Sequence, residues 1–294
     1  LLNRKKETLY GYLFLLPSLA GFTIFLLIPI LFSVYLAFTN WDVISGFNNI
    51  NFIGLENFTR MIGDEWFNAS IKNNFVYTLV VVPVTLILSL LIAIILNNMV
   101  YMKNVLRLAY FIPYVSNTVA VSVLWMAMFD PSQGPVNQLL MALGVQSPPK
   151  WLVSPDWAMV TIILMSVWTR IGYCLIIYLA ALQNLPQELY EAANIDGANW
   201  YRKLKSITIP LLTPTTFFLV ITQTISTFQV FAPVNLLTRG GPGTSTTVLV
   251  YQLYREAFRF YHMGYASAIA MVLFAIIFTV TLIQWRYQDK WVNF

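Results

Sequence analysis

The chain has 294 residues and a formal net charge of +5, with 58% hydrophobic and only 10% charged residues. Ordinary soluble domains carry about 25% charged residues, so lipid must surround much of this chain. The sequence has one cysteine and one histidine, which excludes structural disulfides within the chain, Cys-x-x-Cys metal sites and histidine-rich metal sites. Nucleic-acid binding is also excluded, because basic residues do not gather with aromatic residues outside the apolar runs.

Several apolar runs are long enough for the roughly 20 residues that a helix needs to cross a membrane. The first follows a basic N-terminal stretch and is longer than the apolar core of a signal peptide, which has about 7–15 residues. No alternating β-barrel pattern occurs. The runs cover residues 9–38, 75–96, 108–129, 157–182, 211–237 and 263–285. We therefore predict an all-α integral membrane protein with six transmembrane helices, forming a single transmembrane domain over residues 1–294.

The basic residues predict the orientation, because lysine and arginine are more frequent in cytoplasmic segments. With the N-terminus inside, the cytoplasmic segments contain Arg4, Lys5, Lys6, Lys103, Arg107, Arg202, Lys203, Lys205, Arg286 and Lys290. The outer segments then contain Arg60, Lys72, Lys150, Arg239, Arg255 and Arg259. This asymmetry predicts that both termini are cytoplasmic, and it places the segment between the fourth and fifth runs in the cytoplasm.

Two local signals add detail to the structure predicted around the third run. Pro113 is expected to kink its helix, which helix bundles tolerate when neighbouring groups satisfy the backbone. Beyond this run, residues 130–137 are rich in turn-forming residues and predict a turn before a short amphipathic helix over residues 138–143.

Polar side chains inside membrane spans are costly, so they mark either a transport pathway or a contact between helices. The fourth and fifth runs are rich in them, and aromatic rings beside amides and hydroxyls suit a polyhydroxylated sugar. The predicted substrate-binding residues are Trp168, Thr169, Arg170, Tyr173, Gln223, Ser226, Thr227 and Gln229, with Asn117 as a candidate from the third run. Bonding between neighbouring helices is the alternative role for each of them.

Arg170 lies at the middle of the fourth run, and no acidic residue lies inside any predicted span. If it faces the substrate, it favours acidic saccharides or other ligands that carry an anion. Otherwise it bonds to backbone carbonyls, or it pairs with an acidic residue of another subunit.

The polar segment over residues 184–210 lies between the fourth and fifth runs. Gly197 predicts the left-handed residue that ends a first short helix. Asn199 can cap a second helix, which we expect Pro210 to end. The segment therefore predicts two short cytoplasmic helices.

The spacing E-A-A-x3-G-x9-I-x-x-P in this segment resembles the EAA loop of ABC importer permeases, with Ile209 where that family usually has leucine. The stretch Thr238-Arg239-Gly240-Gly241-Pro242 looks like one of the two permease subunits in carbohydrate importers of the maltose-uptake type. The resemblance covers nearly the whole chain and implies the type I ABC importer permease fold with a cytoplasmic coupling helix. It implies that the loop docks on an ATPase subunit through Glu191, Ala192, Ala193, Asp196, Gly197, Ile207 and Pro210.

By the same resemblance, sugar-contacting positions fall in the fourth and fifth runs. The pattern W-x-x-x-G-Y at Trp168, Gly172 and Tyr173 anchors the fourth, and Thr227 and Val230 are the aligned positions of the fifth.

The resemblance implies an ATP-driven importer that moves a saccharide into the cytoplasm by alternating access. The substrate is expected to be an oligosaccharide, with acidic ones among the candidates. The implied partners are a second homologous permease subunit, two ATPase subunits and an extracytoplasmic solute-binding protein, in a bacterial cytoplasmic membrane. The chain lacks the phosphate-loop motif G-x-x-x-x-G-K, so we expect no enzyme activity and no cofactor here, with ATP and Mg bound by the ATPases.

Other functions remain open at this point. Import of a non-sugar polyol such as a glycerol phosphodiester would suit the same fold. An ion-coupled secondary transporter would require intramembrane carboxylates or inverted repeats, and neither is visible in the sequence. An intramembrane enzyme would need a nucleophile with its base, or a metal-ligand motif.

Overall fold

The computed structural model describes residues 2–46, 49–98 and 102–288, so Lys290 and its neighbours lie outside the described residues. The described residues form helices joined by turns, with one isolated antiparallel bridge between Thr39 and Phe52 and no strand. This confirms the all-α prediction. The chain divides into two compact units, Leu1–Asp64 with Leu253–Val272 and Glu65–Gln252 with Leu273–Phe294.

Within the described residues, five helical stretches are long and apolar enough to cross a membrane. They cover Lys6–Leu36, Glu65–Asn98, Pro155–Gln183, Thr213–Leu237 and Met263–Arg286. A sixth candidate is a pair of helices, Lys103–Val115 and Thr118–Met128, whose directions differ by 98°. The single helix expected over residues 108–129 is therefore corrected to two helices, α5 (Lys103–Val115) and α6 (Thr118–Met128).

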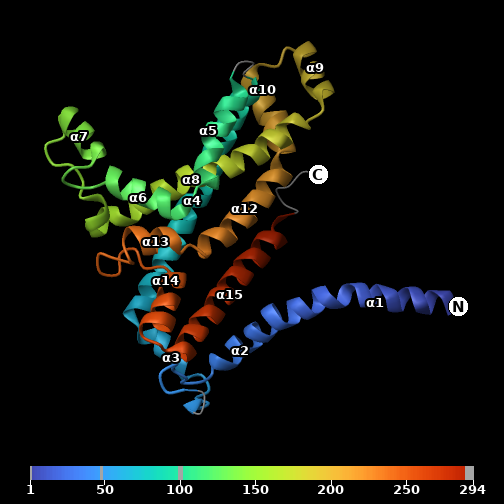
Figure 1. Ribbon diagram of the computed structural model, residues 1–294. Coiled ribbons are helices and arrows are strands. Elements are labelled where there is room, and N and C mark those ends of the chain that lie inside the picture. Colours follow the sequence, from blue (N-terminus) through green and yellow to red (C-terminus); the bar gives the residue numbers. More distant parts are fainter. Residues whose placement is uncertain (1, 47–48, 99–101, 289–294) are drawn as a thin grey trace. The chain divides into compact units, whose positions relative to one another are not determined.

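The bend between α5 and α6 has local causes (Figure 1). Pro113 lacks a backbone N–H and disturbs the last turn of α5. Ser116 then adopts an extended conformation, with φ −71° and ψ 148°. Asn117 caps α6, because its side-chain oxygen accepts a bond from the Val119 N–H at 2.8 Å. The chain thus ends one helix and starts another within two residues, Ser116 and Asn117.

The first unit begins with one continuous helical stretch, made of α1 (Leu2–Phe22), the π-turn η1 (Thr23–Leu27) and α2 (Ile28–Leu36). It also contains α3 (Glu56–Gly63), the π-turn η5 (Arg255–Arg259) and the start of α15 (Met263–Arg286). The buried Asn57 joins α3 to the chain that follows α2, since its amide donates to Ala37 O at 2.9 Å and Thr39 O at 2.8 Å.

The second unit is built on three long helices, α4 (Glu65–Asn98), α8 (Pro155–Gln183) and α12 (Thr213–Phe228), and both α4 and α5 pack along α8. Ser89 on α4 donates to Ile171 O on α8 at 3.2 Å, so these two helices are bonded as well as packed. One cluster of buried core residues in this unit contains Val82, Leu86, Ala93, Ile94, Leu96, Cys174, Leu175, Tyr178, Leu179, Leu182, Leu212 and Leu219.

Gly172 permits the close approach of α8 to α5. A Cβ atom at this position would lie 2.9 Å from Phe111 Cα and even closer to Tyr110 O, and both of these are backbone atoms of α5. Backbone cannot move aside as a flexible side chain does, so the contact requires a residue without a side chain.

The turn after α6 leads into the short helix α7 (Pro135–Ala142), which confirms the predicted turn and helix, three residues earlier than expected. Bonds from the backbone N–H of Gln133 and from Ser132 lower the pKa of the Asp130 carboxyl below its usual value. Asn137 is buried and accepts a bond from Trp151 Nε1 at 2.6 Å, which joins α7 to the 3₁₀ turn η3 (Trp151–Val153). The loop is thus an ordered structure of its own.

Two adjacent asparagines of α4 hold the loop between α13 (Ala232–Leu237) and α14 (Leu249–Tyr254). Asn73 donates to Thr244 O at 2.8 Å and to Thr247 O at 2.9 Å. Asn74 is fully buried, and its side-chain oxygen accepts a bond from the Leu249 N–H at 3.0 Å.

Replacing Asn74 with leucine is expected to destabilise the protein by about 1–3 kcal/mol, because the Leu249 N–H would be left buried without an acceptor. The thermal midpoint can be followed through Cys174, the only cysteine, which is fully buried and reacts with a thiol reagent only after unfolding. Asn97→Leu, the same change at an exposed position of α4, is the control and should shift the midpoint little. Equal midpoints for the two variants would contradict this account.

Candidate functional site

A cavity of about 460 Å³ lies in the second unit, where the α5–α6 bend faces α4, α8 and the break between α12 and α13. We refer to it as the interhelical cavity. Of the predicted substrate-binding residues, Thr169, Arg170, Ser226 and Gln229 lie on its wall. The structure thus brings residues of the fourth and fifth predicted spans together around one space.

Arg170 links α8 to α12. Its Nη1 donates to Gln223 Oε1 at 3.0 Å and to Ser226 Oγ at 2.9 Å, and its Nη2 donates to Ser226 O at 3.4 Å. Gln223 is therefore a partner of the arginine and is not on the cavity wall. Arg170 therefore bonds to a backbone carbonyl of the neighbouring helix, one of the expected alternatives, and it also lies on the cavity wall, while its contact with substrate stays a prediction.

Val230, one of the two positions that the resemblance aligns in the fifth run, also lies on the wall, whereas the remaining predicted residues do not. Thr227 is fully buried, and its hydroxyl donates within its own helix to Gln223 O and Thr224 O, both at 2.9 Å. Trp168 packs against Trp125, with ring centroids 5.9 Å apart, and Tyr173 stacks on Tyr114 at 5.1 Å. Asn117 is the cap of α6. Their positions indicate roles in packing and helix capping.

Among the wall residues that the sequence does not predict, two are buried and carry a hydroxyl group. Tyr77 on α4 and Ser166 on α8 both line the cavity, and both are buried. Ser166 lies four residues before Arg170, on the same face of the helix, so helical spacing from Arg170 could have identified it. Tyr77 carries no comparable signal, because the run over residues 75–96 gives no indication of which face meets α8.

The segment between α8 and α12 contains α9 (Gln187–Ile195), α10 (Trp200–Lys203), the π-turn η4 (Leu204–Thr208) and α11 (Ile209–Leu211). Gly197 has a φ of +68°, and Asn199 Oδ1 accepts a bond from the Arg202 N–H at 2.9 Å, so both predicted helix boundaries are confirmed. The expectation that Pro210 ends the second helix is wrong. The π-turn before it widens the helix and accommodates the proline, and α12 follows almost directly.

Bonds between α9 and the helical segment after it make this region a coherent unit. The Tyr190 and Thr208 hydroxyls are 2.8 Å apart and hydrogen-bonded, and Lys203 Nζ donates to Asn194 Oδ1. Glu191, Ala192, Asp196 and Gly197 are exposed, whereas Ala193, Ile207 and Pro210 are half-buried.

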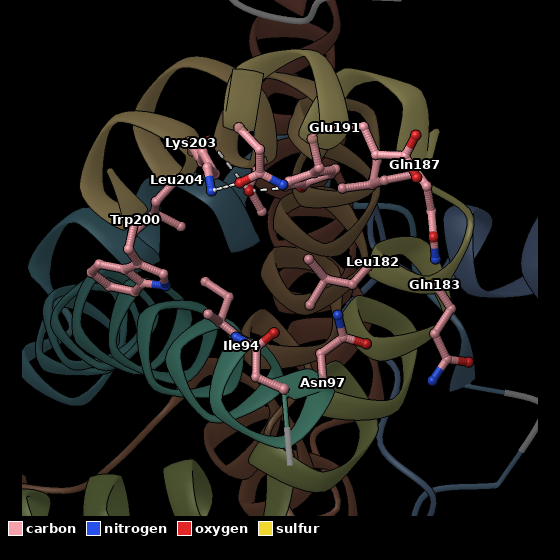
Figure 2. Close-up of a pocket in the computed structure, with 14 residues that line it drawn as sticks. Ile94, Asn97, Leu182, Gln183, Gln187, Glu191, Trp200, Lys203 and Leu204 are labelled. Carbon is pink, nitrogen blue, oxygen red and sulfur yellow. Dashed lines mark hydrogen bonds between the residues drawn. The ribbon is translucent and has the colours of Figure 1, made fainter. Parts of the chain in front are cut away.

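A second cavity, of about 590 Å³, lies between this segment and the ends of α4 and α8; we refer to it as the coupling cavity. Figure 2 shows Trp200 and Lys203 on one side of it and Gln183 and Gln187 on the other, with Glu191 above them. Its wall is mainly polar, and Glu191 is its only acidic residue among those the structure describes. The exposed carboxylate is therefore available to another protein.

The family described as "Binding-protein-dependent transport system inner membrane component" matches residues 69–293. The chain is 38% identical to the probable ABC transporter permease protein YesP of Bacillus subtilis, over 99% of this chain and 94% of YesP. It is 36% identical to the lactose transport system permease protein LacF of Rhizobium radiobacter, over 93% of this chain and 92% of LacF.

A solved structure shares the fold, with a TM-score of 0.84 and 25% identity over 99% of this chain and 97% of the other. It is the crystal structure of a bacterial alginate ABC transporter in complex with an alginate pentasaccharide-bound periplasmic protein. Together with the apolar helices, these matches identify a multi-pass inner-membrane component of a transport system that works with a binding protein. The chain belongs to the family of binding-protein-dependent transport system inner membrane components.

Proposed function

We propose that this chain is the permease subunit of an ABC importer that moves a saccharide into the cytoplasm by alternating access. The observation that carries the proposal is that α8 and α12 supply residues to the interhelical cavity and also flank the α9–α11 segment along the chain. A push on that segment therefore acts on both helices that line the cavity.

A saccharide suits the residues around the cavity. Hydroxyl and amide groups of Thr169, Ser226 and Gln229 lie beside the aromatic rings of Tyr114 and Phe231, and this mixture matches the hydroxyls and apolar faces of sugar rings. LacF is a lactose transport permease, and the solved transporter is in complex with a protein that holds an alginate pentasaccharide. Both similarities support a saccharide for this chain.

The partners in this proposal are a second homologous permease, two ATPase subunits that bind ATP and Mg, and an extracytoplasmic solute-binding protein. The EAA residues of α9, led by Glu191, dock on an ATPase. Both termini are cytoplasmic, as the basic residues predict, and residues 1–294 act as one permease domain in a bacterial cytoplasmic membrane. Family membership favours this assembly over an ion-coupled secondary transporter.

The test is the ATPase activity of the complex purified with its co-expressed partners. Binding protein loaded with one member of a panel of neutral and acidic oligosaccharides is expected to stimulate ATP hydrolysis severalfold. Binding protein without ligand, and the panel without binding protein, are the controls. If no ATPase co-purifies and an ion gradient drives uptake instead, the proposal is wrong.

A further inference from the structure

Arg170 is the only charged residue among the described residues that line the interhelical cavity. A guanidinium keeps its charge at any physiological pH, and here its partners among the described residues are neutral: an amide oxygen, a hydroxyl and a backbone carbonyl. A positive charge within a membrane span is costly unless an anion compensates it. No residue on the described wall of the cavity supplies that anion.

The donors of Arg170 are only partly used. A guanidinium has five N–H donors, and the bonds to Gln223 and Ser226 take both N–H groups of Nη1 and one of Nη2. The Nε–H and the second N–H of Nη2 have no partner among the described residues. Two parallel N–H groups on one edge of a guanidinium match the two oxygens of a carboxylate or phosphate. Gln223 and Ser226 thus hold the guanidinium and leave this pair unused.

Two residues of the same wall carry hydroxyl oxygens that are covered by neighbouring atoms. Tyr77 is 0% exposed and Ser166 is 3% exposed, and the hydroxyl oxygens of both lack a hydrogen-bond partner within the described residues. The N-terminal end of α6 also meets this wall through Thr118 and Val121, and helix N-termini favour negative charge.

We infer that the interhelical cavity contains a subsite for the oxyanion of a charged saccharide or polyol, either a uronic acid carboxylate or a phosphate ester. Arg170 binds the oxyanion through its unused pair of N–H groups. Gln223 is a positioning residue, because it acts through the guanidinium. This inference rests on the proposed function and narrows its substrate class.

The experiment measures ligand binding to the complete permease–ATPase complex in nanodiscs by calorimetry, without binding protein, so that the permease alone determines the affinity. Three probes are used: an oligouronate, the same oligosaccharide with its carboxyls reduced to hydroxymethyl groups, and a glycerol phosphodiester. Wild type is expected to bind at least one of the two anionic probes about tenfold or more tightly than the reduced oligosaccharide. The oligouronate and the phosphodiester distinguish the two sources of the oxyanion.

The variant Arg170→Gln is expected to lose about 10- to 100-fold in affinity for the anionic probe, the range for losing hydrogen bonds to a charged group. Its affinity for the reduced oligosaccharide should change little. Arg170→Lys keeps the positive charge but lacks the two parallel N–H donors, so it should bind the anionic probe with intermediate affinity. Tyr77→Phe and Ser166→Ala should change anion binding little, because their hydroxyl oxygens are covered and make no bond within the described residues. Arg286→Gln, at the exposed end of α15, is the control.

Equal wild-type affinities for the anionic and reduced probes would overturn the subsite and leave the saccharide importer intact. So would an equal loss of both affinities in Arg170→Gln, since Arg170 would then only join α8 to α12. A complex that binds none of the probes and shows no ATP-driven uptake of any saccharide would overturn the proposed function as well.

Discussion

Replacing Glu191 with alanine is expected to lower ATP-driven uptake at least tenfold in the assembled importer, while the permease remains folded. Glu191 is exposed on α9, and no hydrogen bond or ion pair to another described residue involves its carboxylate. Its removal therefore costs the fold little. If the carboxylate is bonded by a buried donor of the ATPase in the complex, truncation should cost about 2–5 kcal/mol of coupling. Uptake and ligand-stimulated ATP hydrolysis should fall together.

Glu188→Ala is the matched control for this experiment. Glu188 is also exposed on α9, one turn earlier, but it does not line the coupling cavity. The change removes the same carboxylate and should leave uptake within about twofold of wild type, as surface substitutions usually have small effects. An equal loss in both variants would mean that the charge of α9 matters and the position of Glu191 does not.

The second large effect is expected for Gly172→Ala, which should destabilise the protein by about 1–3 kcal/mol through overpacking. The added methyl group would meet the backbone of Tyr110 and Phe111 on α5. The two helices would have to separate, and the wall of the interhelical cavity would shift with them. The thermal midpoint from Cys174 labelling should fall, and substrate affinity should weaken.

Gly21→Ala is the control for this prediction, because Gly21 also lies in a spanning helix and a Cβ there would meet nothing within 4 Å. Alanine favours a helix by up to about 1 kcal/mol relative to glycine, so the Gly21 variant should unfold at the wild-type temperature or slightly above it. A midpoint for Gly172→Ala that matches this control would show that α5 and α8 can separate without cost.

Hydropathy predicts the spanning helices well because length and polarity decide whether a segment can lie in lipid. It does not predict the bend between α5 and α6, since residues 108–129 are apolar on both sides of it. Two residues in the sequence signal the bend, Pro113 and the capping residue Asn117. Only Pro113 leads to a predicted kink in the sequence analysis. The side-chain oxygen of Asn117 caps α6, and a contact of this residue with substrate stays a prediction.

The sequence also predicts in part that the fourth and fifth spans share one site. Their polar residues indicate a shared space, and the structure places Arg170 against Gln223 and Ser226. Which polar residues face that space depends on helix rotation, and the sequence of one chain does not determine it. Thr227 shows the difficulty, because a threonine hydroxyl can bond to its own helix and turn away from the cavity.

The π-turn η4 has a consequence for the length of the chain. Such a turn holds one more residue than the α-helix around it, and one residue corresponds to about 100° of rotation. Deleting a single residue from Leu204–Thr208 would restore a regular helix and keep the chain helical into α12. Because the wider π-turn absorbs its extra residue, this deletion would leave the downstream face in nearly the same orientation, so that Gln223 and Ser226 would still meet Arg170. The segment before α12 can therefore lose one residue without changing which face of α12 meets α8.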